Sequence, residues 1–186
     1  MVHLILGSDK FQEGLALYMK RHEYGNTVTA DLWQAWAKVS GKDIPSIMST
    51  WTEQMGFPLV KVEQVEGAEG GKLKLKFTQS WFLADGSFDA EKDEDKVWTI
   101  PLAIQGGGQE GQPHMLMMDQ RECVLEVPGA ADAWVKVNYG QDALCRVNYT
   151  PGLLDRLSGA IRRKELPAKD RAALLSDAVA LSKARV

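Results

Sequence analysis

Two adjacent residues, His22 and Glu23, have the types that could begin a zinc-binding HExxH motif. In that motif two histidines one helical turn apart hold the metal, and the glutamate activates a water molecule. The position of the second histidine is occupied by Asn26, and the other histidines, His3 and His114, lie in different segments. We interpret the pair as exposed polar residues at the end of a helix. The sequence predicts no catalytic, cofactor-binding or metal-binding residue in this chain.

A run of glycines at residues 106–108 is a second candidate, because glycine-rich loops can cradle phosphate. Such a loop needs a lysine and a hydroxyl residue that lead into a helix, whose amino end then faces the anion. Here the run is followed by Gln109, Glu110 and Gly111 and then by a predicted strand. This order favours a flexible hairpin loop.

Two charged runs remain. The acidic run at residues 89–96 is rich in oxygen ligands, but it lacks the ordered spacing and central glycine of a calcium-binding EF-hand loop. We expect a solvated loop there. The basic cluster at residues 162–164 lies near a predicted helix end, where its charge suits the helix dipole, and anion binding is the lesser alternative.

Aromatic side chains could also offer a binding surface for a sugar or a peptide. Three tryptophans lie at helical spacing and three in or near predicted strands: Trp33, Trp36, Trp51, Trp81, Trp98 and Trp134. Because large aromatic side chains are more often part of a core, we predict core positions for them. An unrelated sugar- or peptide-binding sandwich is therefore the least favoured interpretation. No serine, cysteine or histidine arrangement indicates a nucleophile with its base.

The bulk composition narrows the class of protein. With 186 residues and a net charge of -3, the chain gives no reason to expect nucleic acid or an anionic membrane as a partner. Two cysteines, Cys123 and Cys145, cannot build a disulfide framework, which favours a reducing compartment. Residues 1–7 are too short for a signal peptide or a membrane span. We expect a cytoplasmic location.

The elements that would carry these residues follow from the period of the apolar side chains. Residues 1–55 show helical spacing in three stretches, the first after a cap at Ser8, the second stopping at Gly41, and the third capped by Asp43 and running to Met55. From residue 150 the helical period returns, with a cap at Thr150 and a second stretch after residue 167.

Between these regions the period changes to two, as in a strand with one wet face. Seven short strands are predicted, at residues 57–65, 73–77, 98–104, 115–118, 123–127, 134–139 and 144–149. Strands of this number and spacing indicate a small antiparallel β-sandwich. Two helices after it cannot bury both of their faces, which indicates the start of a longer helical array.

Residues 51–60, WTEQMGFPLV, resemble a hallmark of the gluzincin zinc aminopeptidases, most closely the puromycin-sensitive type. The resemblance continues in order along nearly the whole chain, at residues 31–33, 40–42, 98–101, 134–138, 146–149, 166–171 and 177–178. One departure is the sequence Ala143, Leu144 and Cys145, where the family has a glycine and aromatic residues.

The resemblance implies three parts. Residues 1–55 would be the last helices of a thermolysin-like catalytic domain, residues 56–149 the β-sandwich domain, and residues 150–186 the first helices of a C-terminal, armadillo- or HEAT-like helical domain. In this family the HExxH motif, the glutamate ligand and the tyrosine that stabilises the tetrahedral intermediate all precede the matched region. The resemblance therefore implies an internal fragment of a zinc aminopeptidase that contributes structure and is inactive alone.

The same interpretation sets the expected partners. They are the remainder of the aminopeptidase chain and, in the parent only, zinc and a peptide substrate. Removing the parent's neighbouring helices would expose the apolar residues Met1, Val2, Leu4, Ile5 and Leu6, so we expect a homo-oligomer. The alternative function is a naturally truncated, non-catalytic binding or regulatory module.

Overall fold

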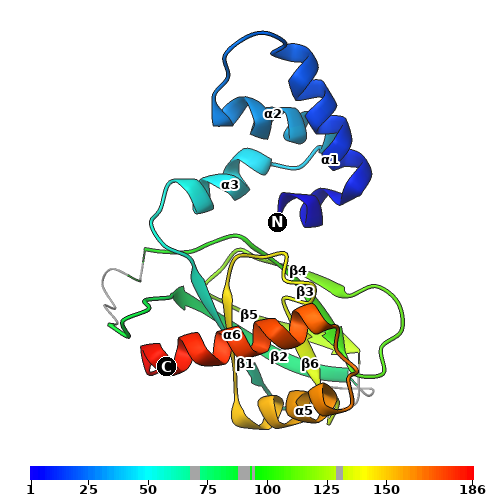
Figure 1. Cartoon of the computed structure of the whole chain (residues 1–186), viewed down its shortest axis with the longest axis vertical. Helices are drawn as coiled ribbons and strands as arrows, with labels where there is room; N and C mark the ends of the chain where they lie inside the picture. The colour runs from blue at the N-terminus through cyan, green and yellow to red at the C-terminus, as the bar shows by residue number, and fades with distance from the viewer. Residues whose placement is uncertain (68–71, 88–92, 94, 129–131) are drawn as a thin grey trace. The chain divides into compact units, whose positions relative to one another are not determined.

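The computed structural model describes residues 1–67, 72–87, 93, 95–128 and 132–186 (Figure 1). The chain forms two compact units, Met1–Met55 and Gly56–Val186. No helix in the described ranges combines the length and the apolar character needed to cross a bilayer. The division of the chain into three parts, at residues 55 and 149, stays a prediction.

The first unit contains the helices α1 (Val2–Arg21), α2 (Thr29–Ser40) and α3 (Ile44–Thr52). The end of α2 is confirmed, because Gly41 follows it in the left-handed conformation with φ 69°. The predicted cap of α3 is confirmed as well, because the Asp43 carboxylate accepts a 3.2 Å hydrogen bond from Ser46 N. The helix ends at Thr52, however, and Met55 is exposed rather than part of its apolar stripe.

Helix α1 begins earlier than predicted and is interrupted at Gly7, which has φ 75° and ψ 166°. Glycine suits this position because it has no Cβ to clash. Ser8 Oγ lies 3.1 Å from His3 Nε2 across the break. The segment before the break is not an open apolar surface, because Val2 and Ile5 are buried in the core of this unit. The predicted exposure of these residues was therefore wrong.

Trp36 is the centre of the contact between α1 and α2. Its indole stacks on Phe11 and on Trp33, and Nε1 donates a 3.0 Å hydrogen bond to Phe11 O. The close approach requires glycine at residue 14, because a Cβ on Gly14 would lie 2.1 Å from Trp36 Cδ1.

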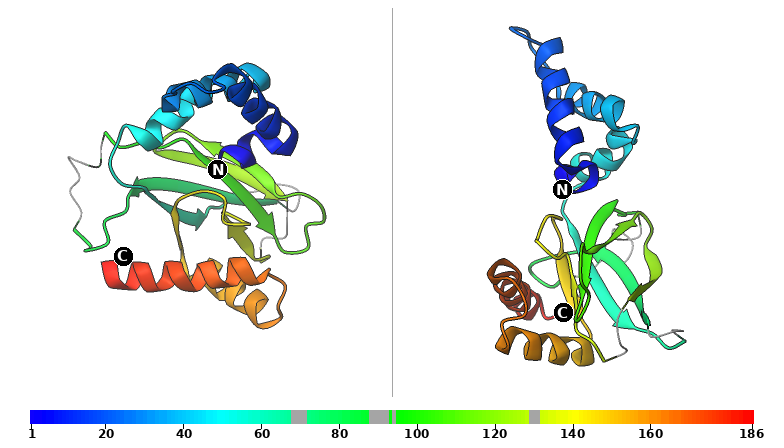
Figure 2. Two further views of the ribbon diagram at one scale, coloured as in Figure 1. Left: turned by 45° about the horizontal axis from the view of Figure 1, so that its top comes forward. Right: turned by 90° about the vertical axis from the view of Figure 1, so that its right-hand side faces the viewer.

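The second unit contains all seven predicted strands: β1 (Pro58–Gln64), β2 (Lys72–Trp81), β3 (Ile100–Gly106), β4 (His114–Met118), β5 (Glu122–Pro128), β6 (Val135–Val137) and β7 (Arg146–Tyr149). They form two small sheets, with strand orders β5-β2-β1-β7 and β4-β3-β6 (Figures 1 and 2). Apolar and polar side chains alternate along β2, so one face of the strand is buried and the other is more exposed. Leu73, Leu75 and Phe77 are buried, while Lys72 and Lys76 pair with glutamates of β5.

The sheets are not wholly antiparallel, which corrects the prediction. β1 and β7 run parallel, with Leu59 opposite Arg146 and Val62 opposite Tyr149. A parallel pair needs a long crossover connection. The chain supplies one, since it passes through the whole second sheet between β1 and β7.

Helices α5 (Pro151–Arg162) and α6 (Ala168–Ala184) belong to the same unit as the sheets. α5 contacts β6, and α6 lies against β7 (Figure 2). α5 starts at the predicted proline. The buried residues of α6 are spaced alternately four and three apart, so that the two aspartates and the two leucines each recur after seven residues. They are Asp170, Leu174, Asp177, Leu181 and Ala184.

Candidate functional site

The three histidines are not brought together. His3 lies in α1 with its ring edge-on to Phe11, and His22 follows α1 with its ring 5.4 Å from that of Tyr18. His114 begins β4, in the other unit. Within the described ranges, no group of three or more histidine, cysteine, aspartate or glutamate side chains is placed to hold a metal ion. The described residues therefore do not fit a zinc site.

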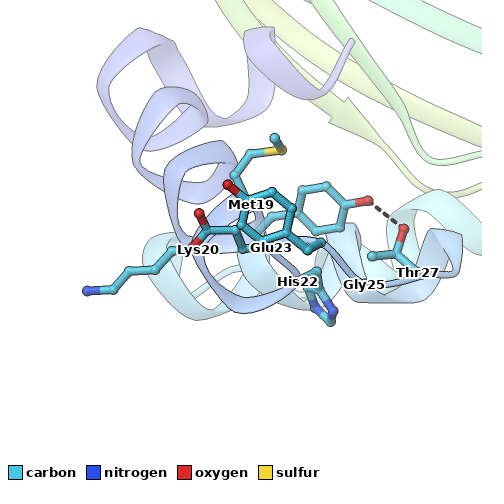
Figure 3. Close-up of a pocket in the computed structure, with 8 residues that line it drawn as sticks. Met19, Lys20, His22, Glu23, Gly25 and Thr27 are labelled. Atoms are coloured by element: carbon cyan, nitrogen blue, oxygen red, sulfur yellow. Dashed lines mark hydrogen bonds between the residues drawn. The ribbon is translucent and has the colours of Figure 1, made fainter.

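A hollow of about 630 Å³ lies at the end of α1 (Figure 3). Its walls include Tyr18, Met19, His22 and Tyr24, and Tyr24 is fully exposed with φ 57°. The Tyr18 hydroxyl is 2.7 Å from Thr27 Oγ1, which fixes that ring. Within this hollow the described contacts include no hydrogen bond between a nucleophile and a base. It offers an aromatic surface but not an arrangement for catalysis.

Gly107 and Gly108 of the glycine run and Arg163 of the basic cluster, which the sequence treats as separate candidates, line one hollow of about 470 Å³. Gly107 N donates to Trp134 O at 2.8 Å, and Trp134 Nε1 donates to Glu165 Oε2 at 2.7 Å. Arg163 is paired with the same glutamate at 2.5 Å. Because this arginine is neutralised and two further carboxylates line the hollow, the arrangement is not a phosphate cradle.

Most of the acidic run, residues 89–92 and 94, lies outside the described residues. Asp93 is described, and it does not point into solvent as expected. Its carboxylate accepts a hydrogen bond from Trp81 N and forms a 2.6 Å ion pair with Arg121. These contacts tie Asp93 to the end of β2 and to the turn before β5.

The tryptophans are confirmed as core residues in two cases. Trp36 and Trp98 are buried, and the other four are half-buried. Gln79, which is buried in β2, binds the backbone of Trp98 on both sides, with Nε2 to Trp98 O and Trp98 N to Oε1, each at 2.9 Å. This side-chain amide fastens β2 to the segment that leads into β3.

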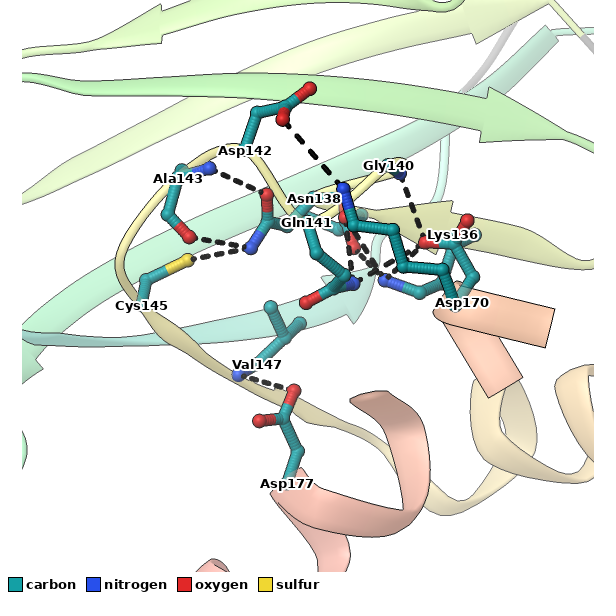
Figure 4. Close-up of polar contacts among 12 residues, drawn as sticks. Lys136, Asn138, Gly140, Gln141, Asp142, Ala143, Cys145, Val147, Asp170 and Asp177 are labelled. Atoms are coloured by element: carbon teal, nitrogen blue, oxygen red, sulfur yellow. Dashed lines mark hydrogen bonds and ion pairs between the residues drawn. The ribbon is translucent and has the colours of Figure 1, made fainter. Parts of the chain in front are cut away.

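The most completely built polar cluster surrounds Lys136 on β6 (Figure 4). Lys136 and Asp170 are each 1% exposed, and Nζ lies 3.6 Å from Asp170 Oδ1. Lys136 Nζ also donates to the carbonyls of Val137 and Asn138. Asp170 Oδ1 accepts from Gly140 N at 3.0 Å, so both charges have several partners. A buried ion pair needs such additional hydrogen bonds to offset its desolvation.

The loop between β6 and β7 is shaped to supply these partners. Asn138, Gly140 and Gln141 all have positive φ, at 53°, 78° and 56°. The Asn138 amide bridges the loop, accepting from Ala143 N at 3.1 Å and donating to Ala143 O at 2.9 Å. Asparagine is the residue type, after glycine, that best tolerates this left-handed conformation.

Two helical turns after Asp170, Asp177 makes a second contact between α6 and the strands. Its carboxylate accepts from Arg146 at 3.1 Å and from Val147 N at 3.3 Å. The second bond uses a backbone N–H of β7, which lies at one edge of its sheet. Asp170 and Asp177 thus fix where α6 lies along the sheet.

The Tyr149 hydroxyl joins the two sheets at their β6 and β7 edges. It accepts a 2.9 Å hydrogen bond from Val137 N and lies 3.4 Å from Val137 O. Val137 and Tyr149 are both buried. The hydroxyl therefore satisfies a backbone N–H group that has no access to water.

Burial controls the titration of this cluster. It lowers the pKa of Lys136, which nearby Asp170 partly counteracts, and it raises the pKa of Asp177 against the opposing effect of Arg146. Burial also raises the pKa of Tyr149. Cys145 keeps some exposed surface as a residue, but burial of its thiol raises that pKa to about 12. A thiol held protonated is a poor nucleophile, so Cys145 is not poised for nucleophilic attack.

Sequence reasoning missed this cluster. Lys136 stands between Val135 and Val137 in a strand that is buried on both faces, where a lysine is not expected. The visible signal was the seven-residue spacing of Asp170 and Asp177 in line with two leucines of α6.

Comparison with known proteins finds two family domains in this chain. Residues 1–51 match the Peptidase family M1 domain, and residues 134–186 match the ERAP1-like C-terminal domain. Aminopeptidase 2 of Candida albicans is 35% identical over 182 residues, which cover 98% of this chain and 19% of that protein. Puromycin-sensitive aminopeptidase of Caenorhabditis elegans is 35% identical over 186 residues, 97% of this chain and 19% of that protein.

Aminopeptidase M1 of Arabidopsis thaliana is 32% identical over 198 residues, which cover 100% of this chain and 21% of that protein. The chain thus spans about a fifth of the length of these relatives. The matches confirm the resemblance carried by residues 51–60 and their flanks. The chain belongs to the M1 peptidase family, and it covers the end of that family's peptidase domain and the start of its ERAP1-like C-terminal domain.

Proposed function

We propose that this chain is the structural junction of a zinc aminopeptidase of the puromycin-sensitive type, which removes residues from the amino terminus of peptides. The first unit would close a thermolysin-like catalytic domain. The two sheets would be a sandwich that braces this domain against an armadillo- or HEAT-like helical domain, of which α5 and α6 would be the first helices. Zinc and the catalytic groups would lie in other parts of the parent.

The buried pair of Lys136 and Asp170 carries this proposal. It fastens the first residues of α6 to the loop after β6, and Asp177 fastens the middle of the same helix to β7. A junction between two domains needs such directional contacts, because apolar packing alone fixes the position of a helix less uniquely. The described residues give no sign of a catalytic arrangement that would compete with this role.

The test is a chimera. The aligned segment of the Caenorhabditis elegans puromycin-sensitive aminopeptidase is replaced by this chain, which aligns over 97% of its length. We expect the chimera to hydrolyse leucine p-nitroanilide and the isolated chain not to. The Asp170→Ala chimera should lose thermal stability and activity together, whereas Asp142→Ala, which removes an exposed carboxylate, should lose neither. A chimera that folds and binds zinc but stays inactive would contradict the proposal.

Location and assembly belong to the same proposal. We place the parent in the cytoplasm because both cysteines are free. The remainder of the aminopeptidase chain would be the natural partner, and the isolated chain would form a homo-oligomer through exposed apolar residues of its first unit, Met19, Tyr24 and Val28. A monodisperse monomer in light scattering across a range of concentrations would contradict the oligomer.

A further inference from the structure

Asp85 and Gly86 form the only aspartate–glycine pair in the sequence. They lie in a turn after β2, in which Gly86 has φ 74° and its backbone N donates a 3.0 Å hydrogen bond to Leu83 O. Asp85, Gly86 and Ser87 are all exposed, and the last two border a hollow of about 240 Å³. Water therefore reaches this turn.

An aspartate followed by glycine has the groups for an intramolecular cyclisation. The backbone N of Gly86 is the nucleophile, and it attacks Cγ of the protonated Asp85 carboxyl group. An N–Cγ bond forms, and the carboxyl OH leaves with the amide proton as water, which gives a five-membered succinimide. Glycine favours this step because it has no Cβ to block the approach. The two groups are adjacent in the chain, which gives them a high effective concentration.

Water reopens the succinimide at either of its two carbonyl carbons. Attack at Cγ restores aspartate, whereas attack at the backbone carbonyl carbon of Asp85 breaks the bond from that carbon to Gly86 N. The main chain then runs through Cβ and Cγ as an isoaspartyl bond, with one additional methylene, and the former backbone carbonyl becomes a free carboxylate. Water is released in the first step and consumed in the second, so no other reactant is needed.

Ser87 controls how readily the cyclisation begins. Asp85 Oδ1 accepts hydrogen bonds from Ser87 N at 3.0 Å and from Ser87 Oγ at 2.7 Å. These bonds, the one from the hydroxyl above all, lower the pKa of the Asp85 carboxyl group. They favour the carboxylate, which reacts more slowly than the neutral acid because it has no good leaving group. The Ser87 hydroxyl therefore slows the cyclisation.

The length of the chain in this turn matters because the turn packs on the end of α6. A Cβ on Gly86 would lie 2.2 Å from Ala184 O, so the two backbones approach closely. Phe82, just before the turn, is buried in one apolar cluster with Leu59, Leu181 and Ala184. An additional methylene beside Gly86 does not fit this contact unless the turn or the helix end shifts.

We propose that Asp85 isomerises spontaneously to isoaspartate, at a rate that the Ser87 hydroxyl restrains, and that the product loosens the end of α6. The pair of Asp85 and Gly86 supplies the acid and the nucleophile, and the contact with Ala184 supplies the structural consequence. Isoaspartate accumulates with the age of a molecule, so the modification distinguishes old chains from new ones. It does not depend on the peptidase role of the parent.

Incubation of the full chain at about pH 5 and at about pH 8 measures the rate, and electron-transfer mass spectrometry locates the isoaspartyl bond. We expect isoaspartate to accumulate at Asp85, and faster at the lower pH, because more of the carboxyl group is protonated there. Asp155, an exposed aspartate that is followed by Arg156, is the internal control and should remain unchanged. The absence of isoaspartate at Asp85 under both conditions would overturn the proposal.

Variants of the two exposed side chains test the assigned groups. Asp85→Asn closes the same ring with ammonia as the leaving group, and it should be converted faster than the native chain. Asp85→Glu would need a six-membered ring and should form no isomer. An Asp85→Asn chain that folds, as circular dichroism would verify, but is not converted would overturn the proposal, because the turn would then keep Gly86 N away from the side chain.

Ser87→Ala tests the restraint. It should raise the rate about fivefold, the effect of losing one hydrogen bond, and Ser87→Thr, which keeps a hydroxyl, should restore the native rate. A rate in Ser87→Ala that is equal to or lower than the native rate would overturn the restraint by Ser87.

The consequence for α6 is measured on the isomerised chain after chromatography has separated it from the unmodified chain. Amide exchange, followed by NMR, should be faster at Leu181 and Ala184 of the isomerised chain. It should be unchanged at Leu153, which is buried in α5. Equal exchange at Leu181 in the two forms would overturn the loosening of α6. None of these results bears on the chimera, which measures hydrolysis.

Discussion

Lys136 and Asp170 form an ion pair at 3.6 Å between β6 and α6, with both side chains 1% exposed. The two residues are 34 positions apart in the sequence. Their partners include backbone groups of the loop after β6, so the pair connects a strand, a loop and a helix at one point. A displacement of β6 or of α6 would therefore disturb the other element through this pair.

Asp170→Ala should be strongly destabilising. It leaves the Lys136 charge buried without its carboxylate, and breaking one side of a buried pair costs about 3–5 kcal/mol. Urea unfolding followed by circular dichroism measures the free energy of unfolding. The control is Asp142→Ala, because Asp142 is half-exposed and 3.8 Å from Lys169, and such surface pairs contribute about 0–1 kcal/mol. Equal effects of the two substitutions would show that the buried pair has no special role.

The double variant Lys136→Met and Asp170→Leu should lose less stability than Asp170→Ala alone. Replacing both charges by apolar groups removes the desolvation cost, and such exchanges are often neutral or stabilising. The loss that remains would come from Gly140 N, which donates to Asp170. A double variant that is less stable than Asp170→Ala would show that the hydrogen bonds, rather than the charge pair, stabilise this junction.

Cys145 should make the stability fall at alkaline pH. Its pKa is raised from 9.0 to about 12 by burial, so the unfolded state loses the thiol proton first as the pH rises. The stabilising contribution is complete below pH 9.0 and is lost progressively toward pH 12. Unfolding free energies of the native chain and of Cys145→Ala, measured from pH 8 to pH 10.5, should therefore diverge above pH 9, with the variant losing less. Parallel curves would contradict a buried thiol.

The strands were predictable because their signals are local. Lys72 and Leu73 begin an alternation that fits a half-buried strand. The alternation after Trp98 also predicts a strand, although β3 proves to be buried on both faces. The burial of Lys136 was not predictable in this way. Its acceptors are the carbonyls of Val137 and Asn138 and the carboxylate of Asp170. No local pattern reveals that a helix far along the chain supplies the opposite charge. The parallel pairing of β1 with β7 likewise depends on strand order, which residues near either strand do not encode.

Gly14→Ala should destabilise the first unit. In an exposed helix this change is stabilising, by up to about 1 kcal/mol. Here the new Cβ would lie 2.1 Å from Trp36 Cδ1, and displacing a packed indole costs about 1–3 kcal/mol. Tryptophan fluorescence during urea unfolding reports the change. Gly152→Ala is the control, because nothing lies within 4 Å of a Cβ there and α5 should become slightly more stable. A neutral Gly14→Ala would mean that the two helices can separate at little cost.

Tyr149→Phe should weaken the contact between the two sheets without changing the apolar packing. The hydroxyl accepts from Val137 N at 2.9 Å, and its removal leaves that buried N–H group without a partner. An unsatisfied buried donor costs about 1–3 kcal/mol. The loss should appear in the urea midpoint and in faster amide exchange at Val137, measured by NMR. Tyr24→Phe, at a fully exposed ring, should change neither quantity. Faster exchange at Val137 without a loss of global stability would show that the β6 edge opens alone, whereas unchanged exchange would show that the Tyr149 hydroxyl does not hold the two sheets together.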